Sequence, residues 1–89
     1  MTHQVLIYSY VPDILEQRAP YREEHLARIA SAKADGRIVM AGPLGDPPTG
    51  ALIVFGEDGA AAAEAFARAD PYVEAGLVTE WRVEPWKVV

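Results

Sequence analysis

Apolar residues along the chain form four short strand-like runs and two longer helical segments. The runs are rich in β-branched and aromatic side chains and occupy residues 4–10, 37–44, 50–55 and 77–86. Residues 14–35 show the apolar spacing of a helix, and the alanine-rich residues 59–69 also favour a helix. The sequence therefore predicts the order strand, helix, strand, strand, helix, strand.

Turn-forming and helix-breaking residues indicate where these elements end. Pro20 lacks a backbone donor and should kink or divide the first helical segment, and Gly36 is a natural end for it. Asp58 is expected to cap the second helix, which Pro71 prevents from simply continuing. Residues 45–49 contain one glycine and two prolines, so the second and third strands should form a hairpin.

This order is typical of the split βαβ, or ferredoxin-like, arrangement of an α+β protein. Its βαββαβ chain forms a four-stranded antiparallel sheet with two helices on one face, so the other face should be polar in a monomer. Three of the four strands are instead apolar on both faces. We expect a second copy of the chain to cover the open face in a homodimer, the commonest symmetric assembly. The alternative is that scattered aliphatic residues are tolerated at the surface.

Length and composition limit the classes of protein and of chemistry. The 89 residues, 51% hydrophobic and 24% charged, fit a single globular domain over residues 1–89 and exclude a disordered chain. With no cysteine, chemistry must come from His, carboxylate, hydroxyl or backbone groups. The net charge of -5 has the wrong sign for binding nucleic acid. No apolar run spans a bilayer and no export signal is evident, so we expect a cytoplasmic protein with no membrane partner.

The first helical segment carries two polar residues on its expected inner side. On a helical wheel Leu15 and Leu26 lie with the other apolar residues on the side that faces the sheet, whereas Arg28 lies on the opposite side. Arg22 and His25 fall within the apolar arc, three residues apart, so they can serve one cavity. The alternative is that Arg22 extends to a surface carboxylate and His25 is a core histidine bonded to a backbone carbonyl.

A carboxylate stands directly after the second helix, in Asp70-Pro71-Tyr72. Both helices of a split βαβ fold cross the same sheet face, so Asp70 could reach His25. A carboxylate bonded to one ring nitrogen sets the tautomer and leaves the other nitrogen free to exchange a proton. The alternative is a helix stop in which the Asp70 side chain binds nearby backbone amides.

Other candidate features are less specific. Gly42 and Pro43 allow a ligand to approach the end of the second strand, although Gly-Pro is also a common strand end. His25 and Asp70 supply two metal ligands, fewer than the three usual at a catalytic zinc site, so we expect no metal. Several aromatic residues can line an apolar pocket or belong to the core or an interface: Tyr8, Tyr10, Tyr72, Trp81 and Trp86.

Four motifs follow one another along nearly the whole chain: Arg22-Glu23-Glu24-His25-Leu26, Ala41-Gly42-Pro43, Asp70-Pro71-Tyr72-Val73-Glu74-Ala75-Gly76-Leu77 and Val83-Glu84-Pro85-Trp86. Together they resemble the YCII-related (YciI-like) family of small bacterial proteins. The resemblance implies a ferredoxin-like dimeric α/β-barrel, similar to muconolactone isomerases, with an active site built on a His–Asp pair. Here that pair would be His25 and Asp70, with Arg22 nearby. The family also includes dehydrochlorinase-like enzymes of aromatic degradation.

These observations lead to one leading functional hypothesis and two alternatives. We predict a small enzyme without a cofactor, a lyase, isomerase or dehydrochlorinase-like protein that acts on a small cyclic or aromatic metabolite. His25 would transfer the proton and Asp70 would orient it as the catalytic pair. Substrate binding is assigned to Arg22, Gly42, Pro43 and Tyr72. The alternatives are a module that binds a small molecule without turnover and a purely structural dimerisation domain.

Overall fold

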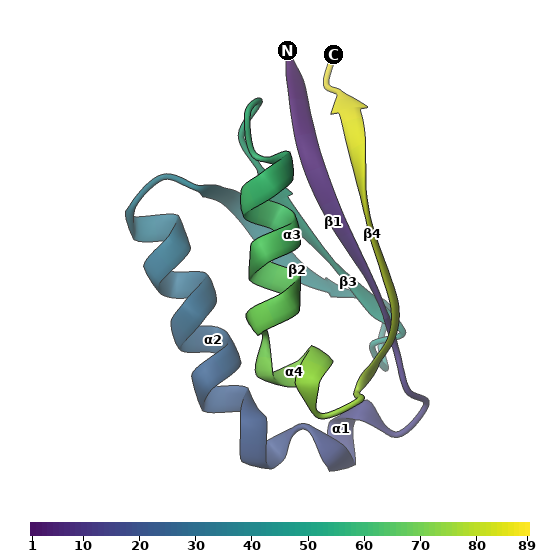
Figure 1. Ribbon diagram of the computed structural model, residues 1–89. Helices are drawn as coiled ribbons and strands as arrows, with labels where there is room; N and C mark the ends of the chain where they lie inside the picture. Colours follow the sequence, from purple (N-terminus) through teal and green to yellow (C-terminus); the bar gives the residue numbers. More distant parts are fainter.

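Four strands form one antiparallel sheet in the computed structural model, which describes residues 1–89. They are β1 (Thr2–Tyr10), β2 (Ile38–Leu44), β3 (Gly50–Phe55) and β4 (Val78–Lys87). The strand order is β2-β3-β1-β4, so the first and last strands of the chain are neighbours and both termini lie at the same end of the sheet (Figure 1). The predicted α+β class and the four-stranded antiparallel sheet are confirmed.

The helices lie on one face of this sheet (Figure 1). They are α1 (Ile14–Gln17), α2 (Ala19–Ala34), α3 (Ala60–Ala69) and the single turn α4 (Pro71–Glu74). The predicted first helix is divided at Arg18, and Pro20 falls in the first turn of α2, where its missing N–H leaves no bond unmade. Gly36 follows α2 with a φ of 84°, a left-handed conformation that ends the helix, as expected.

The start of α3 differs from the prediction that Asp58 caps it. The helix begins after Gly59, and no side chain caps its first turn. The Gly59 N–H donates to the Gly56 carbonyl at 3.0 Å, so a tight turn closes directly before the helix. This turn puts Asp58 one residue too early to reach the unpaired amides of the first turn.

The core lies between the helices and the inner face of the sheet. It includes Leu6 and Tyr8 from β1, Ile53 and Phe55 from β3, and Phe66 from α3, all almost fully buried. Alternate residues along each strand point to the other face. That open face carries the apolar side chains Val5, Ile7, Met40, Leu52 and Trp86, in agreement with the two-sided apolar pattern of the sequence.

The orientation of α2 corrects the helical wheel. His25 is buried as predicted, but Leu15 and Leu26 remain 49% and 44% exposed. Arg28, expected on the solvent side, instead donates to the Phe66 carbonyl at 3.2 Å, and its guanidinium lies 4.5 Å from the Phe66 ring centroid. The break at Arg18 interrupts the helical phase on which the wheel depends, and α2 turns its Arg28 side toward α3.

None of the helices combines the length and the apolar character that a membrane crossing requires.

Candidate active site

His25 and Asp70 stand 45 positions apart in sequence and are in direct contact. The His25 Nδ1 atom lies 2.9 Å from Asp70 Oδ1 and 3.0 Å from Oδ2. Both side chains are buried, and Asp70 has no exposed surface. Since a carboxylate only accepts hydrogen bonds, the proton of a neutral His25 ring belongs on Nδ1 and its lone pair on Nε2. The predicted contact is therefore present, and His25 is bonded to Asp70 rather than to a backbone carbonyl.

The junction between α3 and α4 holds the Asp70 carboxylate in place. Asp70 has an extended backbone, with φ of -71° and ψ of 126°, because Pro71 disfavours a helical residue before it. The Asp70 side chain caps α4 by accepting a hydrogen bond from the Tyr72 N–H at 3.0 Å. The helix stop and the contact with His25 are thus two roles of one side chain.

Tyr8 is a third member of this cluster, in a role that the sequence analysis missed. Its hydroxyl donates to Asp70 Oδ2 at 2.7 Å from the inner face of β1, and the side chain is 1% exposed. Tyr8 stands two residues after Leu6 on the same strand, so both side chains lie on the face toward the helices. That pattern could have identified Tyr8 as inward-facing, but not its partner 62 residues away.

The negative charge of the cluster belongs to Asp70. Burial by itself raises the pKa of Asp70, but the hydrogen bond and charge of His25, with the bonds from Tyr8 and the Tyr72 amide, bring it below its ordinary value of 3.8. Burial and the neighbouring Asp70 charge raise the pKa of Tyr8, so the proton stays on the hydroxyl. At neutral pH the cluster is therefore an ionised carboxylate that accepts bonds from three donors.

Tyr72 fixes the plane of the His25 ring. The two rings are stacked with centroids 3.9 Å apart and an angle of 7° between their planes. Together with the bond to Asp70, this stacking leaves the imidazole little freedom to turn. Burial raises the pKa of Tyr72, which keeps its hydroxyl protonated and able to donate.

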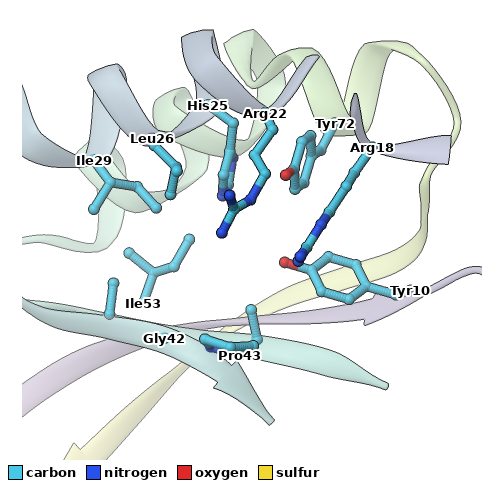
Figure 2. A pocket seen from close by; sticks show the side chains of 12 residues that line it. Tyr10, Arg18, Arg22, His25, Leu26, Ile29, Gly42, Pro43, Ile53 and Tyr72 are labelled. Atoms are coloured by element: carbon cyan, nitrogen blue, oxygen red, sulfur yellow. The ribbon is translucent and has the colours of Figure 1, made fainter. Parts of the chain in front are cut away.

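A cavity of about 170 Å³ lies between α2 and the sheet and is lined by His25 but not by Asp70 (Figure 2). Because Nδ1 is bonded to Asp70, Nε2 is the ring nitrogen available to the cavity. Asp70 therefore adjoins the cavity only through its contact with His25. The sheet side of the cavity is formed by small and apolar residues: Ala41, Gly42, Pro43, Ala51 and Ile53. Gly42, Pro43 and Tyr72 thus line the same space as His25.

The charged groups that line the cavity are two arginines. Arg18 and Arg22 both line it, one helical turn apart, and no carboxylate does. Neither guanidinium forms an ion pair or a hydrogen bond within the protein. Tyr10 lies opposite, and burial raises the pKa of its hydroxyl, which therefore stays protonated. The site offers donors and positive charge to a ligand.

Arg18 was not identified from the sequence. It stands at the break between α1 and α2, where a helical wheel drawn for one continuous helix does not predict which way a side chain points. Its spacing of four residues from Arg22 is the signal that could have found it. Three of the candidate aromatic residues do not line the cavity: Tyr8 belongs to the core, Trp81 packs under Arg68, and Trp86 belongs to the open face of the sheet. No three side chains of His, Cys, Asp or Glu come together in a way that could hold a metal ion.

Comparisons with known proteins give one consistent result. A family model described as the YCII-related domain matches residues 1–87. An uncharacterized protein of Haemophilus influenzae is 34% identical over 96 residues, which cover 98% of both chains. Protein YciI of Escherichia coli O6:H1 is 38% identical over 86 residues, which cover 86% of this chain and 88% of the relative.

The solved structures that this chain resembles include an enzyme of the same fold. It is a 5-chloro-2-hydroxyhydroquinone dehydrochlorinase, TftG, from Burkholderia phenoliruptrix AC1100, in complex with 2,5-dihydroxybenzoquinone. The superposition has a TM-score of 0.76 and a sequence identity of 26%, and it covers 96% of this chain and 93% of the other.

Proposed function

The chain belongs to the YCII-related domain family, and from this premise we propose that it is a small acid–base enzyme acting on a single-ring, anionic substrate, with His25 as the group that moves the proton. The observation that carries the proposal is the His25 ring itself. One nitrogen is bonded to a buried carboxylate while the other is available to a cavity lined by two unpaired arginines.

The bond to Asp70 prepares His25 to accept a proton. With Nδ1 donating to Asp70, a substrate in the cavity meets the Nε2 lone pair, and the imidazolium formed after proton transfer is stabilised by the carboxylate charge. Asp70 also keeps the ring oriented without touching the substrate. This division of roles is the one expected of a general base and its positioning residue.

Arg22 supplies the complementary charge for the reacting end of the substrate. Its guanidinium reaches into the cavity beside His25 (Figure 2). When Nε2 removes a proton from a ring hydroxyl or a ring carbon next to a carbonyl, the substrate becomes an oxyanion or enolate. A nearby guanidinium stabilises that anion through charge-assisted hydrogen bonds.

The size of the cavity favours a compact substrate. Its volume of about 170 Å³ is close to that of cavities of roughly 150 Å³ that hold one benzene molecule. The dehydrochlorinase with the similar fold was solved with a single-ring quinone. A dehydrochlorination releases one proton and one chloride, and the electron pair left by the proton forms the new double bond as chloride departs. His25 can take the proton in such a reaction or in an isomerisation of a cyclic acid.

We also propose that two copies of the chain pack through their open sheet faces in a dimeric α/β-barrel. The open face has a hollow of about 250 Å³ whose lining is mostly apolar, with one carboxylate: Val5, Ile7, Leu52, Glu84, Pro85 and Trp86. Met40 and Trp86 are 58% and 45% exposed there. Large exposed apolar patches of this kind mark interaction surfaces, and a matching face is supplied by a second copy.

Turnover and binding must be measured together to test the enzymatic role. The wild type is screened against chlorinated hydroquinones, lactones and other small cyclic acids, and its hits are repeated with His25→Gln and Asp70→Asn. We expect His25→Gln to lower kcat by about 10²- to 10⁴-fold, the usual contribution of a general base. Asp70→Asn should also lower kcat, because the amide no longer supports the imidazolium.

Two results would contradict the proposal. The first is a wild-type protein that binds a compound from the screen and never converts it, which would indicate a binding module. The second is unchanged turnover in a folded His25→Gln variant.

A further inference from the structure

The six arginines of the chain differ in one respect that bears on the ligand. Four have partners within the protein: Arg28 and Arg68 lie over aromatic rings, and Arg37 and Arg82 form ion pairs. The remaining two, Arg18 and Arg22, have no such partner, and both line the cavity.

Acidic residues that could pair with these two arginines are plentiful, since the chain contains 13 of them and has a net charge of -5. None of the acidic side chains lines the cavity. Arg18 and Arg22 carry like charges and line the same cavity, so they repel each other while the cavity is empty. A ligand that brings negative charge to both guanidinium groups removes this repulsion.

The two guanidinium groups serve different parts of the cavity. Figure 2 shows the end of Arg22 beside His25, whereas Arg18 extends across to the hydroxyl of Tyr10. The Tyr10 hydroxyl forms no hydrogen bond within the protein and keeps its proton, because burial raises its pKa. Arg18 and Tyr10 can therefore both donate to one anionic oxygen group at their side of the cavity.

We propose that the site selects single-ring dianions, with one anionic group at Arg22 and His25 and the second held by Arg18 and Tyr10. Arg18 is then the residue that determines specificity for the second charge. Ligands of this class are rings with two carboxylates, or with a carboxylate and an ionised ring oxygen. The inference rests on the proposed function only in calling the Arg22 end the reacting end.

Binding of matched aromatic acids tests this inference without any turnover. The probes are benzoate, with one carboxylate, and isophthalate and terephthalate, with two, measured by calorimetry at low and high salt. We expect at least one dianion to bind wild type about tenfold more tightly than benzoate, because each well-placed charge-assisted bond contributes on that scale. High salt should reduce this preference.

Arg18→Gln should remove the preference, because it should weaken binding of the dianion about tenfold while the affinity for benzoate changes less than about threefold. Arg18→Lys keeps the charge but not the planar donor set, so it should retain part of the preference. Arg68→Gln changes an exposed arginine of α3 that does not line the cavity, so it is the matched control and should leave all three affinities unchanged. Circular dichroism and tryptophan fluorescence confirm that each variant is folded.

The inference is overturned if neither dianion binds better than benzoate, including the case in which neither binds at all. It is also overturned if Arg18→Gln weakens benzoate as much as the dianions. Its failure is separable from that of the proposed function. Dianion preference in a protein that converts no substrate leaves the inference standing, whereas efficient conversion of monoanions alone overturns the inference and supports the acid–base role.

Discussion

Replacing Tyr8 by Phe removes one hydroxyl from the buried end of the His25–Asp70 pair and leaves the rest of the side chain in place. The lost bond joins the Tyr8 hydroxyl to Asp70 Oδ2 over 2.7 Å. The aromatic ring keeps its core contacts, so almost no packing energy is lost. The change in the free energy of unfolding therefore measures the contribution of the hydrogen bond to the buried Asp70 carboxylate.

The magnitude follows from the charge of the acceptor. Hydrogen bonds to charged groups contribute roughly 1.5–3 kcal/mol, and Asp70 keeps its bonds from His25 and the Tyr72 amide. We expect Tyr8→Phe to lower the free energy of unfolding by about 2 kcal/mol at pH 7. Tyr21→Phe removes a hydroxyl that forms no hydrogen bond from a side chain that is 37% exposed, and it should cost less than about 0.5 kcal/mol.

The loss of stability caused by Tyr8→Phe should become smaller at acid pH. The pKa of Asp70 in the folded protein lies below 3.8, so the ionised carboxylate stabilises the fold fully above that pH. This stabilisation is lost as the pH falls through the folded-state pKa. Tyr8→Phe removes one of the bonds that lower the pKa of Asp70. The difference between wild type and variant should therefore be constant from pH 5 to pH 7 and shrink in acid.

Urea unfolding at fixed protein concentration, followed by the fluorescence of Trp81 and Trp86, measures these differences at a series of pH values. A loss below about 0.5 kcal/mol at pH 7 would show that the hydroxyl does not stabilise an ionised Asp70. A loss that does not shrink at any pH between pH 5 and acid unfolding of the wild type would contradict the assignment of the charge to Asp70.

Two further predictions concern the sheet. A Cβ on Gly50 would overlap the Tyr8 carbonyl oxygen, so Gly50→Ala should lower the free energy of unfolding in urea by about 3 kcal/mol or more. Gly56→Ala, with no atom near its Cβ, should change this free energy little. Equal effects of the two substitutions would refute this explanation. Met40→Asp puts a charge on the open face at a 58% exposed position, so it should dissociate the proposed dimer in sedimentation equilibrium without loss of helix or strand content. A wild-type protein that sediments as a 9.7 kDa monomer at micromolar concentration would contradict the dimer.

Much of the fold could be predicted because its signals are local. Alternation of apolar residues marked the strands, and Gly36 and Pro71 marked the ends of helices by their own backbone preferences. The contact between His25 and Asp70 could be anticipated because the split βαβ topology brings the end of α3 toward α2. Asp58 shows the limit of such signals, because the turn closed by Gly56 and Gly59 decided where α3 begins.

The sequence by itself determined the order of the elements, the two-sided apolar character of the sheet, and the inward position of His25 on α2. Arg22, expected to point inward as well, lines the cavity but remains exposed. Only the tertiary structure decided how those parts meet. The turn of α2 toward α3 placed Arg28, partly buried, against Phe66, and the Arg18 side chain at the break between α1 and α2 lines the cavity. Likewise, the hydrogen bond from the Tyr8 hydroxyl to Asp70 joins two residues that are 62 positions apart in the sequence. The physical reason is that local patterns depend on neighbours along the chain, whereas the rotation of a helix and the partner of a buried polar group depend on packing between distant segments.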